Sequence, residues 1–356
     1  MVNPLISLNI DYRPSFPKDF RPGVGVIGVG NIVRNAHLKA YSLYDVNVVG
    51  VYDVNPKATE NIEREFGVRR VFDSVDALIN HPDVVIVDVT PHPKDRVPLV
   101  KRALRAGKHV LSQKPLASTL AEARELIELA DRQGVQLAVN QNGRWSPPWR
   151  IATLLIQQGV IGDVLEVTHL FDNSFAWTMG TTFDDIRQFV IYDYAIHWFD
   201  ITRCWLENKT VDTIRAREYR PPNQPSEAKT PWAMWSEITY TDGTNAMIRG
   251  GGVSVTSKPS HPFWIHGTQG VIRGSNLRDD WVELERDGEF TRFDLQGNWF
   301  PNGFAGTLGE LAHAIVENRE PWNSAKHNYL SLKMTLAACR SADLDGQPLK
   351  IQEFEG

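Results

Sequence analysis

An aspartate and a histidine stand four residues apart in the segment Asp193-Tyr194-Ala195-Ile196-His197. On a helix this spacing places both side chains on one face, so the carboxylate can orient the imidazole, favour its charged form or contact a substrate directly. Histidine takes up and returns a proton near neutral pH, which suits acid–base catalysis. The alternative is a surface ion pair or a core histidine satisfied by an acid, and the spacing alone favours that alternative. No metal is expected, because no third ligand follows at a useful spacing.

Lys114 lies just past the apolar, strand-like segment 109–112, after Gln113, and precedes Pro115. The carboxyl end of a parallel strand is where open α/β sheets bind their ligands. A lysine at that edge can present its ammonium group to a substrate hydroxyl. Most lysines are solvated surface residues, but this position favours a functional role.

The segment 24–33 reads V-G-V-I-G-V-G-N-I-V and predicts a buried strand, a sharp turn and the start of a helix. Gly28 and Gly30 remove side chains where a phosphate would approach the backbone. A helix that begins near Asn31 would direct its N–H groups and positive dipole end at that phosphate. The third glycine position of the dinucleotide fingerprint holds Val33, so we expect the helix to lie slightly further from the strand.

A second apolar run, 47–52, ends in Asp53, 25 positions after Gly28. Dinucleotide-binding folds carry a ribose-binding acid about 20 residues after the first glycine. The ordered strand, turn, helix, second strand and acid favour a dinucleotide site over an ordinary strand–turn–helix. A carboxylate accepts hydrogen bonds from a ribose diol and repels a 2′-phosphate, so we expect NAD, with NADP disfavoured.

The composition limits the class of protein. The chain has 356 residues, 42% of them apolar, which is enough for sizeable cores and predicts one or two domains. A net charge of −5 argues against a nucleic-acid partner. Cys204 and Cys339 fit free thiols in a reducing compartment. No apolar run approaches the roughly 20 residues of a membrane span and no signal peptide is evident, so we expect no membrane partner and, by default, a cytoplasmic location.

The elements that must position these residues fall into two patterns. From Gly23 to Asn142 strands alternate with helices, which predicts a parallel sheet with right-handed crossovers. The pair Pro147-Pro148 indicates a boundary, and the strand-rich remainder contains a hairpin signal at Asp242-Gly243. We therefore expect an arm over 1–22, which is loose or docks on another subunit. A dinucleotide-binding domain follows over 23–142, and an α+β domain with a large, mostly antiparallel open sheet over 143–356.

In this order, the motifs of the chain resemble those of the Gfo/Idh/MocA oxidoreductases, named for glucose–fructose oxidoreductase and inositol dehydrogenase. The resemblance runs from Gly23 to the C-terminal helix. The segments that carry it are G-V-I-G-V-G-N-I at 25–32, A-H-L at 36–38, T-P at 90–91, A-G-K-H-V at 106–110, Q-K-P-L-A at 113–117, and the D-x-x-x-H of 193–197. The Q-K-P-L-A segment is similar to the family's E-K-P-L.

The resemblance implies a Rossmann domain followed by an α/β domain whose open sheet mediates oligomerisation, so the expected partner is a second copy in a homodimer or homotetramer. It also implies that Lys114 positions the substrate and tunes its reacting hydroxyl, that His197 is the general base during oxidation and that Asp193 assists it. The residues implied to bind the cofactor are Gly28, Gly30, Asn31, Ile32, Asp53, Thr90, Pro91, His92, Gln113, Lys114, Asn142 and Arg144.

Three positions depart from the family pattern. Gln113 replaces the glutamate, which removes a charge beside Lys114 and should slightly disfavour its charged form. Arg96 replaces a common histidine, and Ala195 stands where a glycine is frequent. Several tryptophans lie beside polar residues and prolines, where a flat ring can cover the face of a sugar. The side chains expected to select the substrate are Trp145, Trp177, Arg187, Trp232 and His261.

These observations predict an NAD-dependent dehydrogenase that oxidises a hydroxyl of a sugar, polyol or cyclitol by hydride transfer. Two alternatives stay open. One is a sugar-converting enzyme with permanently bound NAD, in which transient oxidation permits elimination, and so glycoside cleavage, or epimerisation. The other is an NAD(H)-sensing protein without turnover, against which the intact Lys114, Asp193 and His197 argue.

Overall fold

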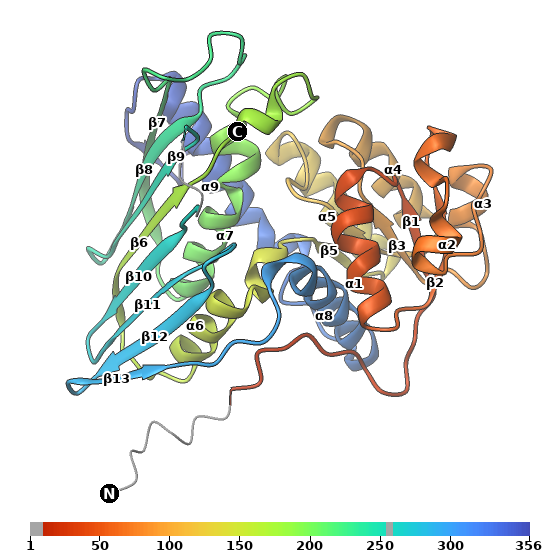
Figure 1. The fold of residues 1–356 in the computed structure, drawn as a ribbon, viewed down its shortest axis with the longest axis horizontal. Coiled ribbons are helices and arrows are strands. Elements are labelled where there is room, and N and C mark those ends of the chain that lie inside the picture. Colours follow the sequence, from red (N-terminus) through yellow and green to blue (C-terminus); the bar gives the residue numbers. More distant parts are fainter. Residues whose placement is uncertain (1–9, 254–258) are drawn as a thin grey trace, which may run out of the picture. The chain divides into compact units, whose positions relative to one another are not determined.

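The computed structural model describes residues 10–253 and 259–356, and the chain forms two compact units (Figure 1). The parallel-sheet unit comprises residues 13–145 and 299–329. The large-sheet unit comprises residues 146–298 and 330–356, together with the described residues before Arg13. The expected fold class, a Rossmann domain followed by an α+β domain with a mostly antiparallel sheet, is confirmed.

The parallel-sheet unit contains five parallel strands in the order β2-β1-β3-β4-β5. They are β1 (Val24–Ile27), β2 (Val48–Tyr52), β3 (Ile86–Val89), β4 (His109–Ser112) and β5 (Leu137–Val139). The chain runs outward from β1 to β2 and then returns to β3 on the other side of β1. The strand order therefore reverses between β1 and β3, which is where doubly wound sheets bind ligands at their carboxyl edge.

Helices connect these strands. They are η2 (Val33–His37), α1 (Leu38–Leu43), η3 (Pro56–Thr59), α2 (Ile62–Phe66), α3 (Val75–Ile79), α4 (Pro93–Arg105), α5 (Leu120–Gln133) and η4 (Asn142–Trp145). The helix after β1 begins at Asn31 and contains the wide π-helical turn η2, whose first residue is Val33. Thr119 caps α5 by accepting a hydrogen bond from the Glu122 N–H, and Gly134 ends that helix in the left-handed conformation.

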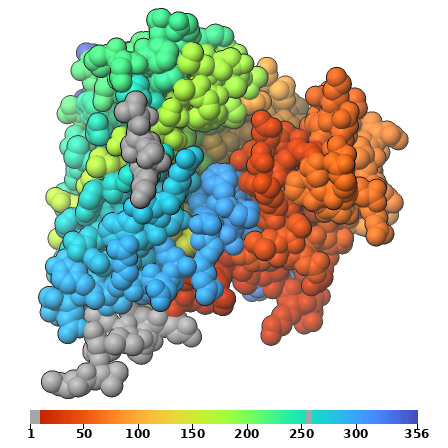
Figure 2. Space-filling view, in the orientation of Figure 1, coloured from red at the N-terminus to blue at the C-terminus, as the bar shows by residue number. Residues whose placement is uncertain are grey.

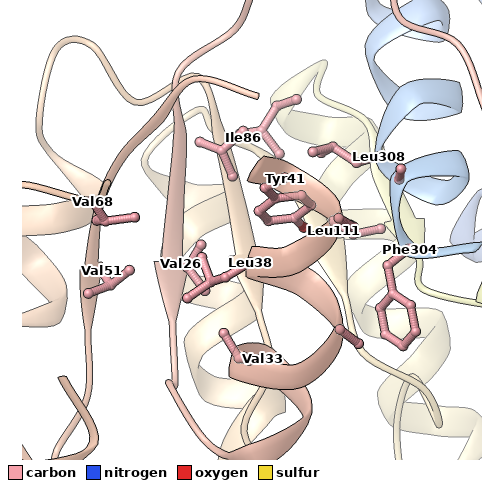
Figure 3. Close-up of a cluster of buried hydrophobic side chains, with 14 of the residues drawn as sticks. Val26, Val33, Leu38, Tyr41, Val51, Val68, Ile86, Leu111, Phe304 and Leu308 are labelled. Atoms are coloured by element: carbon pink, nitrogen blue, oxygen red, sulfur yellow. The ribbon is translucent and has the colours of Figure 1, made fainter. Parts of the chain in front are cut away.

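One face of this sheet packs against α1 and against α8 (Phe304–Glu317), a helix from the C-terminal half of the chain (Figure 3). Phe304 and Leu308 of α8 share a single buried cluster with Val26 and Leu111 of the sheet. The connecting turn η7 (Trp299–Gly303) lies beside α1, and in Figure 2 the blue chain borders the red chain of this unit. The predicted first domain ended at residue 142, whereas the structure adds residues 299–329 to this unit. The reason is that the apolar face of α8 completes the core of the first sheet.

The expected N-terminal arm packs on this same unit from Arg13 onward. The ring of Phe16 contacts the core cluster and lies 6.0 Å from the Tyr44 ring. The Ser15 hydroxyl lies 3.2 Å from Nε2 of His313 on α8. A Cβ at Gly309 would collide with the Ser15 carbonyl oxygen, so the glycine permits the close approach of arm and helix.

The large-sheet unit has nine strands in the order β13-β12-β11-β10-β6-β9-β8-β7-β14. Among these pairs, β6 and β9 are parallel and the others are antiparallel. The strands are β6 (Val164–Asp172), β7 (Val211–Tyr219), β8 (Ala233–Tyr240), β9 (Asn245–Gly251), β10 (Pro262–Gly267), β11 (Val271–Ser275), β12 (Trp281–Arg286), β13 (Glu289–Arg292) and β14 (Leu349–Lys350).

Helices cover one face of this sheet, as Figure 1 shows, and leave the other face open. They are α6 (Pro147–Gln157), α7 (Ile196–Trp205) and, from Leu330 onward, α9 (Ala325–Asp343), with the short turns η5 (Ala176–Thr178) and η6 (Val190–Tyr194) before α7. Pro147 and Pro148 occupy the first turn of α6, where the missing N–H costs nothing. Across the described ranges, no helix has the length and apolarity needed to cross a lipid bilayer.

Candidate active site

The glycine turn after β1 leaves the backbone open at the start of the first helix. Gly28 has a φ of 90°, and a Cβ there would lie 2.5 Å from the Thr90 hydroxyl oxygen. That hydroxyl donates to the Ile27 carbonyl over 2.9 Å, which ties the turn to the end of β3. Gly30 and Asn31 are exposed, and no other group lies within 4 Å of a Cβ built at Gly30. Exposed backbone at a helix start fits the pyrophosphate of a dinucleotide.

Asp53 stands at the end of β2, beside this turn. Its Oδ2 accepts a hydrogen bond of 2.6 Å from the Val29 N–H, and its Oδ1 accepts one of 2.8 Å from the Asn55 N–H. The carboxylate is half-buried, and each of its oxygens can accept a further hydrogen bond. Its position and remaining acceptor capacity fit the ribose hydroxyls that the sequence predicts for it.

Lys114 follows β4, two strands along the sheet from β1, and is half-buried. Its backbone N–H donates to Oε1 of the neighbouring Gln113 over 3.0 Å. Thr90, Pro91 and His92 follow β3 at the same carboxyl edge of the sheet and are also half-buried. The edge thus gathers most of the predicted cofactor residues with Lys114.

Arg96, a buried residue that was not predicted to belong to the site, links the loop after β3 to the loop after β4. Arg96 donates to the Pro91 carbonyl from Nε and to the Gln113 carbonyl from Nη1, each over 2.8 Å, and it also donates to the Pro115 carbonyl. The side chain is 3% exposed. The planar fork of a guanidinium suits several carbonyls at once, so Arg96 fixes the backbone on both sides of Lys114.

Two further residues that were not predicted to belong to the site, His37 and Asp88, lie below this edge. His37 Nδ1 is 2.7 Å from Oδ2 of Asp88, and both side chains are fully buried. The signal available in the sequence was an acid inside the otherwise apolar strand β3, together with the histidine of the A-H-L motif.

Asn142 and Arg144, also predicted to bind the cofactor, are buried in η4. Asn142 Oδ1 accepts a hydrogen bond of 2.6 Å from Nε1 of Trp299. Arg144 lies 2.9 Å from Nδ1 of His327 and donates to the Trp322 carbonyl, and its guanidinium lies 5.0 Å from the centre of the Trp322 ring. These contacts hold η4 to the segment 299–329 of the same unit.

In the large-sheet unit, Asp193 and His197 lie on one helical stretch formed by η6 and α7. Asp193 is 9% exposed and His197 is half-buried. The Ala195 N–H donates to the Val190 carbonyl over 2.8 Å, which closes the wide π-turn directly before α7. Such π-turns are frequent at functional sites.

Polar and aromatic groups surround this stretch. The hydroxyl of Tyr194 accepts a hydrogen bond of 2.8 Å from Nδ2 of Asn173 and lies 3.5 Å from Nε2 of His261. Burial raises the pKa of Tyr194 and lowers the pKa of His261 to about 4, so both are uncharged near neutral pH. His261 is thereby placed beside the predicted catalytic helix, as a neutral group.

The other residues predicted to contact substrate have different surroundings. Trp177 is 48% exposed, and its ring stands edge-on to Phe183 and Phe189 at 5.2 and 5.7 Å. Trp232 is buried. Arg187 forms an ion pair of 2.5 Å with Asp343.

Trp145 belongs to the parallel-sheet unit, where its ring packs edge-on to Trp322 at 5.5 Å. In the described part of the chain, no group of three His, Cys, Asp or Glu side chains is arranged to hold a metal ion.

Comparison with known proteins decides the family. Residues 23–141 match the profile of the "oxidoreductase family, NAD-binding Rossmann fold", and residues 149–273 match the "GFO/IDH/MocA C-terminal domain". The chain belongs to the GFO/IDH/MocA oxidoreductases. The expected family, the oxidoreductase activity and the NAD cofactor are therefore confirmed.

Two of the following three relatives are named for a small polyhydroxy compound. A D-apiose dehydrogenase from Paraburkholderia graminis is 29% identical over 180 residues, 50% of this chain and 48% of that enzyme, so the chain matches about half of that relative's length. An inositol 2-dehydrogenase from Rhizobium meliloti is 25% identical over 324 residues, 89% of this chain and 96% of that enzyme. The Escherichia coli oxidoreductase YdgJ is 32% identical over 292 residues, 76% of this chain and 80% of that protein.

A crystal structure of an oxidoreductase from Agrobacterium radiobacter in complex with NAD+, L-tartaric acid and magnesium superimposes with a TM-score of 0.82. It is 21% identical and the match covers 94% of this chain and 99% of that one. At this identity the likeness establishes that the two proteins share a fold.

Proposed function

We propose that this family member is an NAD-dependent dehydrogenase that oxidises a hydroxyl of a sugar, polyol or cyclitol. The observation that carries the proposal is the shared carboxyl edge of the parallel sheet, where Lys114 follows β4 while the glycine turn and Asp53 follow β1 and β2. The residues proposed to hold NAD are, at this edge, Gly28, Gly30, Asn31, Ile32, Asp53, Thr90, Pro91, His92, Gln113 and Lys114, and, in η4, Asn142 and Arg144. The names of the apiose and inositol dehydrogenases support the substrate class.

NAD, when bound, supplies the acceptor for a hydride. The chain's own groups handle the proton: His197 takes it from the substrate hydroxyl, and Asp193 orients the imidazole and favours its charged form. Lys114 polarises the oxygen as its negative charge develops, because an ammonium stabilises an alkoxide. The carbon loses a hydride and the oxygen loses a proton, so the product is a carbonyl compound.

Trp177 is the proposed substrate-binding residue of the large-sheet unit. It is 48% exposed and is held by Phe183 and Phe189. Phe189 directly precedes η6, which carries Asp193, so the aromatic group and the acid are joined by a short, ordered segment. A flat ring of this kind covers the carbon–hydrogen face of a sugar or cyclitol.

A screen of aldoses, polyols, inositols and sugar acids with NAD, followed by NADH absorbance, tests the proposal. The His197→Ala variant should lose most turnover while its dissociation constant for NADH, measured by fluorescence, stays within about twofold, because the histidine acts on the substrate proton. Full turnover in that variant would exclude His197 as the general base. NAD that copurifies and does not exchange during turnover would indicate the bound-cofactor alternative. Tight NADH binding with no substrate in the panel would indicate a sensor.

We also propose that the open face of the large sheet forms a homodimer or homotetramer interface. Trp235 of β8, Trp264 of β10 and the half-exposed Met247 of β9 project on the face opposite the buried residues of the same strands. Apolar groups gathered on an open sheet are typical of an interface between proteins. Light scattering on Trp264→Glu should show a smaller assembly than on the parent, and an unchanged mass would exclude this face.

A further inference from the structure

A buried group of polar side chains lies directly below Lys114 in the parallel-sheet unit. Each of its members is at most 5% exposed. They are His37, Tyr41, Asp88, Gln113, Asn140 and Thr307. Unpaired polar groups at this depth are costly. Oδ1 of Asp88 has no hydrogen-bond partner among the described residues, but the contacts of the other atoms are close enough for their donors and acceptors to be assigned.

The Gln113 amide has one orientation that satisfies its neighbours. The Lys114 N–H, which can only donate, lies 3.0 Å from Oε1 of Gln113. The amide nitrogen therefore faces Nε2 of His37, at 2.9 Å. Because an amide NH2 group can only donate, Nε2 of His37 must be the acceptor.

The hydrogen of the His37 ring is then on Nδ1, where it is donated to Oδ2 of Asp88 over 2.7 Å. The same carboxylate oxygen accepts from the Tyr41 hydroxyl over 2.7 Å. Burial and the nearby carboxylate of Asp88 raise the pKa of Tyr41 and keep its hydroxyl a donor.

The remaining neighbour agrees with this assignment. Nδ2 of Asn140 lies 3.2 Å from Nε2 of His37, and Oδ1 of Asn140 lies 2.8 Å from the Thr307 hydroxyl, whose single hydrogen is shared with the Phe304 carbonyl at 2.9 Å. The His37 ring thus has two amide donors on one side and one carboxylate acceptor on the other, which selects a single tautomer.

We propose that Gln113 is a positioning residue: its side chain ties the Lys114 backbone to the His37–Asp88 pair, and the glutamine matches the acceptor nitrogen that His37 presents. A glutamate at 113 would still accept from the Lys114 N–H. Its second oxygen, however, would face the lone pair of His37 Nε2, so His37 would have to bind a proton there. Only the consequence for turnover rests on the proposed function.

Two substitutions distinguish the first bond, from the Lys114 N–H to Gln113, from the second bond, from Gln113 to His37. Gln113→Met removes the acceptor for Lys114 and the donor for His37. Gln113→Glu keeps the first bond and changes the second. Gln133→Glu, at the exposed end of α5, adds the same charge outside the group and is the matched control.

Hydrogen exchange measured by mass spectrometry on the peptide that contains Lys114 reports the first bond. In Gln113→Met its amide should exchange roughly tenfold faster, and in Gln113→Glu and the control it should keep its protection. The histidine ring nitrogens, observed by NMR on labelled full-length protein, report the second bond. The His37 signals, identified by their absence in His37→Gln, should show hydrogen on Nδ1 alone in the parent and on both nitrogens in Gln113→Glu.

An unchanged His37 pattern in Gln113→Glu, or unchanged Lys114 exchange in a folded Gln113→Met, would overturn the proposal. If Gln113→Met does not fold, the NMR comparison of parent, Gln113→Glu and control decides. Neither readout needs a substrate. A parent that fails to bind NADH would therefore refute the proposed function and leave this result standing. Once a substrate is known, kcat should fall in Gln113→Met and be retained in Gln133→Glu.

Discussion

The Val29 N–H donates a hydrogen bond of 2.6 Å to the Asp53 carboxylate, which joins the glycine turn after β1 to the end of β2. The acid thus fixes the backbone of the turn, and we propose that its remaining lone pairs accept hydrogen bonds from the ribose. Substitutions that retain one of these two roles and remove the other can separate them.

Asp53→Asn keeps an acceptor for the Val29 N–H but removes the charge, whereas Asp53→Ala removes both. We expect the dissociation constant for NAD to rise roughly 10- to 100-fold in Asp53→Ala. In Asp53→Asn the preference for NAD over NADP should fall roughly tenfold, because the 2′-phosphate is no longer repelled. Calorimetric titration with both cofactors measures the two effects. Asp45→Ala, at an exposed acid paired with Arg21, is the control, and an unchanged NAD-to-NADP ratio in both Asp53 variants would contradict the assignment.

The two glycines of the turn should respond differently to a methyl group. In Gly28→Ala the free energy of unfolding should fall by about 1–3 kcal/mol, because φ is 90° and the new Cβ would lie 2.5 Å from the Thr90 hydroxyl. Gly30→Ala should change that free energy by about 0.5 kcal/mol or less, since the space there is open. It should nevertheless weaken NAD binding, because the methyl group occupies the position open to the phosphate. Urea unfolding and NADH fluorescence give both quantities, and equal stability losses in the two variants would be inconsistent with this geometry.

Arg96→Lys should be far from conservative. The substitution replaces a planar fork that serves the carbonyls of Pro91, Gln113 and Pro115 with a single ammonium group. We expect the free energy of unfolding to fall by about 2–4 kcal/mol, because buried carbonyls lose charged partners. Denaturant unfolding tests this. Arg102→Lys, whose parent side chain forms an exposed pair with Asp76, should cost about 0–1 kcal/mol. If Arg96→Lys lowers the free energy of unfolding no more than the control does, the bonds of Arg96 to the three carbonyls do not stabilise the fold as proposed.

Acid should destabilise the large-sheet unit through His261. Burial lowers the pKa of this histidine to about 4, whereas in an unfolded chain it titrates near 6.5. As the pH falls from about 6.5 to 4, the unfolded chain binds a proton that the folded chain does not, so stability decreases across this window and is fully retained above it. In His261→Phe the loss of unfolding free energy between pH 7 and pH 5 should be smaller than in the parent by about 1–2 kcal/mol. His266→Gln, at an exposed side chain, is the control, and identical losses in parent and His261→Phe would contradict the assignment.

The local part of the site was predictable from sequence. The strand, Gly28, the helix start and Asp53 are adjacent or follow in a fixed order, and each residue type is required by a backbone conformation or a charge. The position of Lys114 at this edge was predictable for the same reason, since it follows an apolar strand.

The contacts that hold these residues were not predictable, because their partners are distant in sequence. Arg96 appeared as a departure from a family pattern, and its three carbonyl partners became visible only when two loops were placed side by side. Likewise, the sequence shows Asp88 only as an acid in an apolar strand. The structure shows that it contacts His37, which in turn contacts Gln113. Gln113 was expected to change the charge near Lys114, whereas its side chain contacts the Lys114 backbone and His37.

The domain boundary shows a similar limit. The apolar face of α8 indicates that the helix is buried, but nothing in its own sequence says which sheet it covers. The antiparallel strands before it favoured the second domain, and the structure places it with the first.

The return of residues 299–329 to the first sheet has a consequence for biosynthesis and protein engineering. On the ribosome, the cofactor-binding unit lacks part of its interior until residues 299–329 have been synthesised, after the intervening residues 146–298, so most of the large sheet is available for folding before the first core is complete. For the same reason, a chimera that borrows the cofactor preference of another enzyme must exchange two separate gene fragments together, or fuse them into one continuous stretch by circular permutation.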